Sequence, residues 1–217
     1  MIKIEQTETY GWEAAVRGMR NPMNSWDKSD SYWTVTNHDE DSPNRWEYRI
    51  GENDHDLMMR LAKGGSVHAK YRRMITVTCD ITAPLYWWKE FDTYKVGTVA
   101  NSCSTMHKIH AKEFTLDDFS HEHLKKEAKE YLRNTIEALN YYRENFSVFK
   151  DKENWWQMIQ LLPSSYNQKR TVQLNYEVLV GMYRDRKNHK LDEWRDFCKW
   201  VEGLPYPELI VGDSIGE

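Results

Sequence analysis

The sequence contains little of what marks a membrane-spanning or a secreted protein. None of its apolar runs approaches the roughly 20 residues that a helix needs to cross a bilayer. The first residues, MIKIEQTETYGWEAA, lack the basic segment followed by an apolar one that a secretory signal carries. We therefore expect a cytoplasmic protein that makes no contact with a membrane.

Cysteine is scarce, and its distribution is not that of a disulfide or metal site. The three cysteines are an odd number, lie far apart and form no Cys-x-x-Cys pair. Free thiols fit a reducing compartment. His189 and Glu193 have the i,i+4 spacing of one helix face, but the His-Glu-x-x-His arrangement is absent. The sequence therefore predicts no metal site.

The glycine-rich loops that cradle phosphates are also missing, in both the Walker and the dinucleotide form. A formal net charge of −4 at pH 7 argues against a general nucleic-acid binder, which needs a basic excess. Any bound phosphate has to be held by side chains and helix ends instead. Local basic clusters that could do so are Arg72-Arg73, Lys169-Arg170 and Arg184-x-Arg186-Lys187.

What the chain does contain is the composition of one soluble globular domain. It has 217 residues, of which 40% are hydrophobic and 29% are charged. A single core can still grow at this length, so we expect one domain over 1–217. The 10 Trp and 13 Tyr are unusually many. We expect most of them to fill the core, although flat rings also stack on bases and flavins.

Hydrophobic periodicity predicts an α+β fold with few strands and several long helices. β-branched residues favour a strand over 71–81, and Pro84 is well placed to open the helix that follows. An apolar stripe predicts a helix over about 121–142. The remaining predicted elements are a strand over 2–5 and helices over 12–19, 54–63, 152–161, 172–183 and 191–201.

Two stretches are predicted to lack regular structure. The polar segment 20–51 contains two prolines and is interpreted as a mostly irregular insertion. Such loops are binding lids or merely solvated insertions, and Trp26, Tyr32 and Trp33 would give this one aromatic groups with which to close. The tail over 203–217 lacks periodicity and is expected to be loose.

In the stretch 81–107 an apolar run with a double tryptophan passes into short hydroxyl and amide side chains. Such donors and acceptors suit a polar ligand better than a buried apolar contact. The residues are Thr93, Tyr94, Thr98, Asn101, Ser102, Ser104 and Thr105. A hydrogen-bonded structural loop is the alternative interpretation of the same residues.

A series of motifs begins in this stretch and continues beyond it. Ala83-Pro84 closes the predicted strand, and Thr93-Tyr94-Lys95 follows the aromatic helix. The further positions are Thr98, Asn101-Ser102, Ser104, Leu162-Pro163, Lys169, Asn175, Arg186, His189 and Glu193. Over about 64–201 their order and spacing resemble the flavin-dependent thymidylate synthases, in which an Arg-His-Arg triplet stands at Thr93-Tyr94-Lys95. The resemblance implies a small, mostly antiparallel sheet flanked by long helices.

The resemblance also implies a reaction and a set of site residues. In that family FAD is reduced by NADPH, methylenetetrahydrofolate gives the carbon, and dUMP becomes dTMP in a homotetramer with sites between subunits. Ser104 and Arg186 are implied as catalytic residues. The implied substrate contacts are Glu90, Ser102, Ser104, Lys169 and Arg186, and the implied flavin contacts are Thr93, Tyr94, Lys95, Thr98, Asn101, Asn175 and His189.

The chain departs from the family pattern where charge matters most. The triplet has lost both arginines and its histidine, Glu177 and Met106 stand at arginine positions, and Glu90 replaces a glutamine. Lysine and threonine do not reproduce the bidentate contact of arginine with phosphate. Our hypothesis is that part of the charge is restored by Arg72, Arg73, Lys95, Lys108 and Lys169. Two alternatives remain open: a non-catalytic member that binds a nucleotide, and an enzyme that modifies C5 of another deoxyuridine nucleotide.

Overall fold

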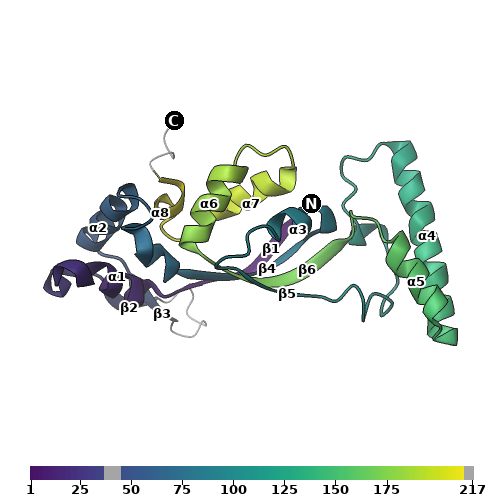
Figure 1. The fold of residues 1–217 in the computed structure, drawn as a ribbon, viewed down its shortest axis with the longest axis horizontal. Coiled ribbons are helices and arrows are strands. Elements are labelled where there is room, and N and C mark those ends of the chain that lie inside the picture. Colours follow the sequence, from purple (N-terminus) through teal and green to yellow (C-terminus); the bar gives the residue numbers. More distant parts are fainter. Residues whose placement is uncertain (37–44, 213–217) are drawn as a thin grey trace.

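A computed structural model of the chain describes residues 1–36 and 45–212 (Figure 1). The strands are β1 (Lys3–Tyr10), β2 (Tyr32–Thr36), β3 (Arg45–Arg49), β4 (Thr76–Pro84), β5 (Val99–Ser102) and β6 (Asn167–Asn175). The helices are α1 (Trp12–Arg20), α2 (Glu52–Lys63), α3 (Leu85–Phe91), α4 (Lys126–Phe149), α5 (Lys152–Leu161), α6 (Tyr176–Arg186), α7 (Asp192–Glu202) and α8 (Glu208–Val211). Short 3-10 turns lie at Asn21–Met23, Trp26–Lys28, Ala69–Arg73 and Leu116–Asp118. The predicted α+β class is confirmed.

The central sheet has four strands in the order β1-β4-β6-β5, and every neighbouring pair is antiparallel. Along β4 the side chains of Val77, Cys79 and Ile81 are buried, whereas the residues between them are only half-buried. This alternation is typical of a sheet with one face on the core. Figure 1 shows α3, α6 and α7 together on one side of the sheet. The predicted small antiparallel sheet flanked by helices is therefore confirmed.

The apolar interior is divided into two clusters. The larger one lies between the sheet and its helices and includes the fully buried rings of Trp87, Trp194 and Phe197. The smaller one lies under α4 and α5, where Leu139 and Met158 are fully buried. Figure 1 shows these two helices as an arm at one end of an elongated molecule.

The prediction of one helix over 172–183 is wrong at its start. Residues up to Asn175 form β6, which pairs with β4 and β5, and α6 begins at Tyr176. The Asn175 side-chain oxygen accepts a hydrogen bond from the Val178 backbone N–H at 3.0 Å and so caps α6 at its first turn. The prediction also missed β5, and it started the long helix α4 five residues too early.

The interpretation of 20–51 as mostly irregular is also wrong. β2 and β3 form an antiparallel hairpin with Trp33 opposite Tyr48; residues 37–44, which join the strands, lie outside the described residues. The segment leading into the hairpin is tied to Asp54, which is fully buried on α2. The Asp54 carboxylate accepts hydrogen bonds from Arg20 Nε (2.5 Å), Ser29 Oγ (2.7 Å), Ser31 Oγ (2.7 Å) and the backbone N–H groups of Asp30 and Ser31 (3.1 Å each).

The carboxy-terminal stretch up to residue 212 is packed rather than loose, contrary to the prediction. α8 buries Leu209, Ile210 and Val211 in the larger core. The hydroxyl of Tyr206 accepts a hydrogen bond from the Ile50 backbone N–H at 3.0 Å. The predicted loose residues 213–217 lie outside the described part of the chain. Within that part, no helix combines the length and apolarity that crossing a membrane requires.

Candidate functional site

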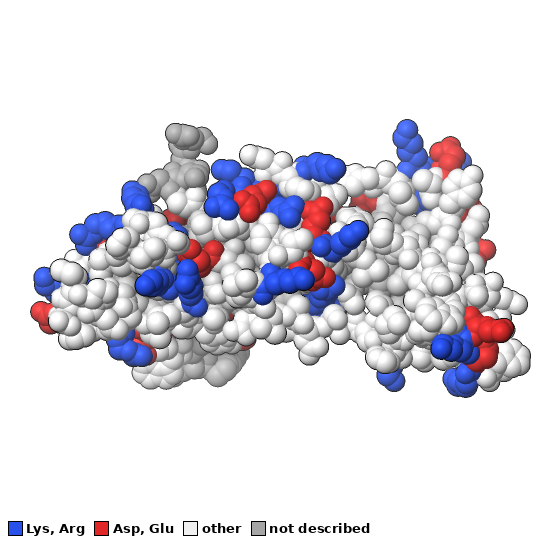
Figure 2. Space-filling model, in the orientation of Figure 1, with Lys and Arg blue, Asp and Glu red and all other residues white. Residues whose placement is uncertain are grey.

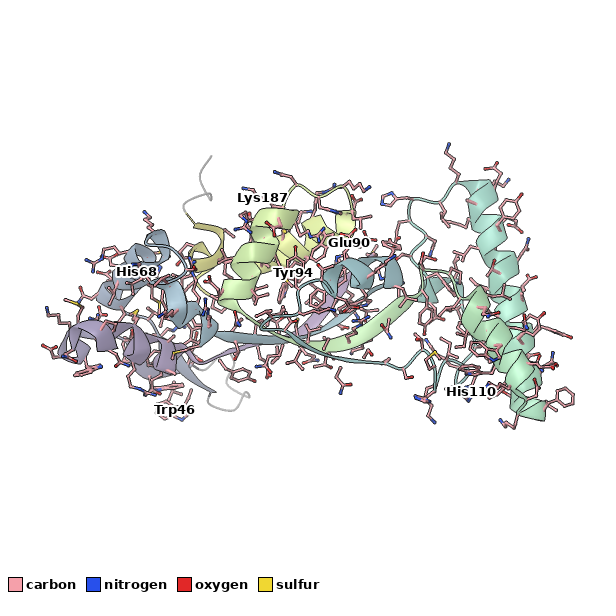
Figure 3. The ribbon with its side chains drawn as sticks, viewed as in Figure 1. Trp46, His68, Glu90, Tyr94, His110 and Lys187 are labelled. Carbon is pink, nitrogen blue, oxygen red and sulfur yellow. The ribbon has the colours of Figure 1, made fainter. Side chains whose placement is uncertain are left out.

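Side chains from three helices and a loop meet beside α6. Arg186, the last residue of α6, donates from Nη1 to Glu90 Oε2 of α3 at 2.7 Å and from Nε to the Tyr94 hydroxyl at 2.8 Å. Trp194 of α7 donates its indole N–H to the same Glu90 oxygen at 3.0 Å. Figure 3 shows Glu90 and Tyr94 close to α6 and α7. The arginine is thus held by partners of its own chain.

His189 completes this cluster from the turn between α6 and α7. Its Nδ1 accepts a hydrogen bond from the Leu191 backbone N–H at 3.2 Å, which leaves the ring proton on Nε2. Nε2 lies 3.5 Å from Glu90 Oε2. The Arg186 guanidinium also lies over the Trp194 ring, 4.7 Å from its centroid. Four predicted site residues, Glu90, Tyr94, Arg186 and His189, therefore converge although they come from distant parts of the sequence.

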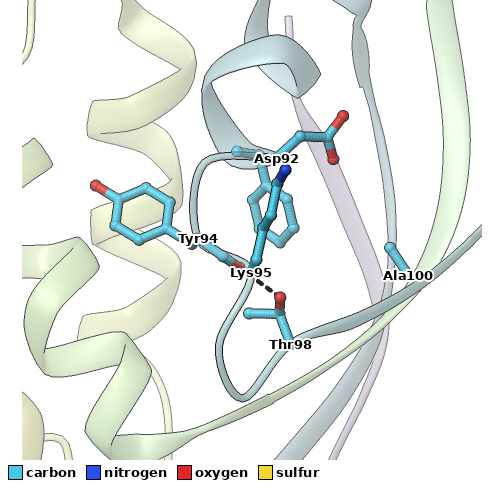
Figure 4. Close-up of a pocket in the computed structure, with 6 residues that line it drawn as sticks. Asp92, Tyr94, Lys95, Thr98 and Ala100 are labelled. Atoms are coloured by element: carbon cyan, nitrogen blue, oxygen red, sulfur yellow. Dashed lines mark hydrogen bonds between the residues drawn. The ribbon is translucent and has the colours of Figure 1, made fainter.

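A small hollow opens next to this cluster, at the place of the altered triplet (Figure 4). It has a volume of about 270 Å³ and is lined by Phe91, Asp92, Tyr94, Lys95, Thr98 and Ala100. The Thr98 hydroxyl donates to the Tyr94 carbonyl, which closes the loop below the hollow. Lys95 has no ion-pair partner within the described residues, so its ammonium group is available to an anion.

The loop that shapes the hollow approaches α6 closely at Gly97. Gly97 has φ +76°, and a β-carbon there would lie 2.8 Å from Asn175 Nδ2 and 2.9 Å from Val178 Cγ2. Only glycine fits that conformation and that contact. Asn175 therefore lies under the loop as well as capping α6, whereas its predicted role was to contact a flavin.

Lys169 lies on the other face of the sheet. Its Nζ pairs with Asp80 Oδ2 at 2.8 Å, and hydrogen bonds from Lys169 and Thr171 hold the pKa of Asp80 below its ordinary value. The next residue, Arg170, points to the helix-covered face and lies over the Trp88 ring, 4.2 Å from its centroid. Neighbouring residues of a strand face opposite sides. Lys169 and the Glu90 cluster are therefore separated by the sheet.

The remaining predicted residues lie along or beyond β5. Asn101 pairs opposite Thr171 and Ser102 opposite Arg170, and both are exposed. Ser104 follows in the next loop, where its hydroxyl accepts from the backbone N–H groups of Met106 (3.2 Å) and His107 (2.9 Å). Thr93 is exposed and donates its hydroxyl proton to the Glu90 carbonyl at 2.7 Å. Among the described residues of one chain, no hydrogen bond or ion pair joins Ser104 to Arg186, the two predicted catalytic residues.

Glu177, which stands at an arginine position of the family pattern, has a cationic neighbour inside the fold. Arg72 is 8% exposed, and its Nη1 lies 3.9 Å from Glu177 Oε2. No other described group pairs with Arg72 Nε or with Glu177 Oε2. Of the cations proposed to compensate for lost arginines, Arg72 thus faces Glu177 and Lys169 faces Asp80, while Lys95 lines the hollow.

Sequence reasoning missed Trp194 and Asp92. Trp194 fixes Glu90 and lies under Arg186, and Asp92 pairs with Arg170 at 2.7 Å at the edge of the hollow. The only signal for Trp194 was its place one residue after the motif residue Glu193.

Figure 2 shows Lys and Arg side chains gathered over the middle of this face of the molecule. Among residues 1–36 and 45–212, no group of three His, Cys, Asp or Glu side chains could hold a metal ion.

Comparison with known proteins identifies the fold. No protein-family model matches the sequence, and no curated protein matches it. Among solved structures, thymidylate synthase X from Helicobacter pylori, solved with FAD and dUMP, superposes with a TM-score of 0.66 at 15% identity, over 99% of this chain and 98% of that one. The UMP/dUMP methylase PolB from Streptomyces cacaoi, bound with 5-Br dUMP, superposes with a TM-score of 0.59 at 13% identity, over 94% of this chain and 89% of that one.

Proposed function

We propose that this chain, which has the fold of the flavin-dependent thymidylate synthases, is a divergent enzyme that methylates dUMP at C5. The observation that carries the proposal is the convergence of Glu90, Tyr94, Arg186 and His189 at the positions that the motif spacing assigns to the site. Two solved proteins of this fold were studied with uracil nucleotides. The proposed co-substrates are NADPH and methylenetetrahydrofolate, the proposed cofactor is FAD, and the proposed location is the cytoplasm.

In this proposal the side chains bind and orient the reactants. When bound, FAD reduced by NADPH supplies the hydride that completes the methyl group on the carbon taken from methylenetetrahydrofolate. Arg186 offers a guanidinium that suits a phosphate or a base oxygen, and Glu90 and Trp194 fix its orientation. When the new bond to C5 has formed, the C5 proton is released to water and the bond between the transferred carbon and the tetrahydrofolate nitrogen breaks, which frees tetrahydrofolate.

The chemistry does not call for a nucleophilic side chain, and the buried thiols would be poor ones. Burial raises the pKa of Cys79 to about 12 and that of Cys198 to about 11. A thiol is nucleophilic only as its thiolate. We propose that this chain contributes electrostatics and positioning to the reaction.

The residues of one chain do not enclose a whole flavin dinucleotide. The hollow of about 270 Å³ is smaller than most ligand pockets, which begin at about 300 Å³. It offers one uncommitted cation, Lys95, for a cofactor with two phosphates. We propose that a second copy completes the site in a homotetramer and brings Ser104, Asn101 and Lys169 to the Arg186 of its neighbour.

The proposal is tested first by the colour of the purified protein. We expect flavin absorbance, and we expect release of tritium from C5-labelled dUMP when NADPH and methylenetetrahydrofolate are supplied. Colourless protein that takes up no added FAD would overturn the enzyme assignment and favour the non-catalytic alternative. The altered triplet Thr93-Tyr94-Lys95 is the feature that supports this alternative.

Replacing Arg186 tests the site itself. Arg186→Gln is expected to weaken dUMP binding by about tenfold or more, because a hydrogen bond to a charged group is worth about 1.5–3 kcal/mol. The control is Arg184→Gln, since the Arg184 side chain is 73% exposed and pairs with its neighbour Asp185. Calorimetric titration with dUMP measures both. Equal affinity for the two variants would place the nucleotide elsewhere.

A second candidate is modification of another uracil nucleotide. The superposition with a UMP/dUMP methylase favours it, because that protein acts on a ribonucleotide as well. Titrations with UMP and dUMP in parallel distinguish the two candidates. Tighter binding of UMP than of dUMP would move the substrate to the ribonucleotide and leave the proposed site in place.

A further inference from the structure

A second and larger hollow lies at the other edge of the sheet. Its volume is about 850 Å³, which is within the range of small-molecule sites. One wall is the second half of β1 and the start of α1, and the other is the β2–β3 hairpin. β1 is one edge strand of the sheet and β5, which borders the Tyr94 hollow, is the other. The site proposed for dUMP and the flavin does not account for this hollow.

The hairpin turns its aromatic face toward this hollow. Trp33 lies opposite Tyr48 and Val35 opposite Trp46, so the two tryptophans and Tyr48 share one face of the hairpin. The Trp33 indole N–H reaches Glu13 Oε2 of α1 at 3.3 Å, and Tyr48 packs against the larger core. Nevertheless Trp33 is 51% exposed and Trp46 is 66% exposed. The two indoles therefore line an open space rather than a closed core.

The walls of the hollow are fixed in position. The chain entering β2 is held by the buried Asp54, and the residue that follows β3, Ile50, is held by the Tyr206 hydroxyl at 3.0 Å. Across the hollow, the turn at Gly11 has φ +87°, and a β-carbon there would lie 2.0 Å from the Met74 carbonyl oxygen. Such walls form the site before a ligand arrives, which reduces the cost of ordering on binding.

The charges around the hollow leave one cation uncommitted. Each lining carboxylate already has a donor: Glu8 accepts from Tyr10, Glu13 from Trp33, and Glu47 pairs with Arg49 at 2.9 Å. Arg17 also lines the hollow, and it has no ion pair with any residue in 1–36 or 45–212. Exposed indole faces favour flat rings, and a free guanidinium favours a carboxylate or a phosphate.

We propose that this hollow binds a planar heteroaromatic ligand that carries an anionic group, with the ring against Trp33 and Trp46 and the anion at Arg17. The anion is a phosphate, as in a nucleotide, or a carboxylate, as in a pterin bearing an amino-acid tail. The inference does not depend on the proposed methylation, because it uses none of the residues of the Glu90 cluster.

Titration calorimetry on the full chain tests this, with adenosine 5′-monophosphate and folic acid as probes. Adenosine and pterin are the matched probes without an acid group. We expect at least one acidic probe to bind, and the probe that binds more tightly identifies phosphate or carboxylate as the preferred anion. Trp46→Leu should weaken that probe about tenfold, as removal of a stacking ring does elsewhere. Arg17→Gln should weaken the acidic probe about fivefold and leave its neutral counterpart unchanged.

Two control variants separate this site from the proposed dUMP site and from general surface effects. Trp26→Leu removes a tryptophan that is 52% exposed and does not line the hollow, and should leave binding unchanged. Arg186→Gln should likewise leave the affinity for the acidic probes unchanged. Loss of binding in Arg186→Gln with retention in Trp46→Leu would assign the probes to the Glu90 cluster and overturn the inference. Failure of both acidic probes to bind the wild type would also overturn it, whether or not the protein methylates dUMP. If the Trp46→Leu variant does not fold, the Trp33→Leu variant is used in its place.

Discussion

Arg186 and Glu90 form the ion pair at the centre of the proposed site, at 2.7 Å and with both side chains only partly exposed. A phosphate that approaches Arg186 meets a carboxylate that already occupies the guanidinium. Where the family has glutamine, a neutral amide would leave that guanidinium more available. Glu90 therefore competes with an anionic ligand for Arg186 while it holds the arginine in place.

Glu90→Gln is expected to tighten dUMP binding about fivefold, because it removes a negative charge near the phosphate and leaves a side chain that still accepts from Trp194. Calorimetric titration at low ionic strength measures the change. Asp185→Asn is the control, since Asp185 is exposed and pairs with Arg184 rather than Arg186. Weaker binding in Glu90→Gln would show that the carboxylate contacts the ligand or is needed to orient Arg186.

Asp54 is the residue that fixes the hairpin segment to the body. Asp54→Asn is expected to lower the free energy of unfolding by about 3 kcal/mol, because it leaves Arg20, which is 4% exposed, without its counter-charge. Urea unfolding at pH 7 measures the loss. Asp56→Asn, on the exposed side of the same helix, is the matched control and should change the stability by less than about 0.5 kcal/mol.

The contribution of Asp54 also depends on pH. Burial alone would raise its pKa, but the hydrogen bonds from Ser31, Ser29 and Arg20 together hold the pKa below the ordinary value. A group with a depressed pKa stabilises the fold above its unfolded pKa of about 3.9 and loses that contribution as the pH falls through the folded pKa. The stability difference between wild type and Asp54→Asn should therefore shrink below about pH 4. A difference that stays constant down to pH 2.5 would contradict this assignment.

At the scale of elements, the sequence predicts helices well where an apolar stripe is long. In α4 the spacing of Leu132, Ile136 and Leu139 is sufficient, and all three are buried. β6 escapes prediction because its buried Val172 continues at helical spacing into the buried Tyr176 and Leu179 of α6, although the strand ends between them. Only the side chain of Asn175, acting as a helix cap, marks the boundary.

The same error limits what the sequence could say about the site. The structure brings Glu90, Arg186 and His189 together, and all three belong to helices or their ends. Whether Lys169 or Arg170 faces the helices depends on the register of β6, and a strand that is not recognised has no predicted faces. Trp194 was missed because nothing in the local sequence distinguishes a ring that fills the core from one that also donates to Glu90.

Helix α8 allows a test at the scale of elements. Its residues lie in the stretch that the lack of periodicity predicted to be loose. Leu209 is fully buried in the larger core. Leu209→Ala should lower the free energy of unfolding by about 3 kcal/mol, as comparable cavity-forming replacements do. The control is Val67→Ala, since Val67 is 69% exposed and lies outside the α4–α5 arm. Urea unfolding with an unchanged midpoint for Leu209→Ala would mean that α8 does not contribute to the core.

At the scale of the whole molecule, the α4–α5 arm has its own small core and still exposes large side chains. The exposed residues of the arm include Tyr131, Tyr141, Val148, Phe149 and Trp156, between 40% and 73% exposed. A group of exposed apolar side chains of this size marks a surface that contacts another protein. An arm that projects from the body, as Figure 1 shows, can reach a second copy of the chain. Residues of one site that lie on different faces of one chain could be brought together in this way.

Replacing two residues of the arm tests the proposed homotetramer and its link to the site. Light scattering coupled to gel filtration should give about four times the 26.0 kDa mass of one chain for the wild type, and a smaller species for the double variant Tyr141→Glu with Phe149→Glu. Charges at these positions cannot be desolvated in an apolar interface without a large penalty. Ser66→Glu adds a carboxylate at an already polar, exposed position outside the arm and should leave the mass unchanged. Because one chain offers a hollow of only about 270 Å³, flavin absorbance should be lost together with the assembly. A wild type that is yellow at 26.0 kDa would show instead that one chain holds the flavin alone and that the arm serves another partner.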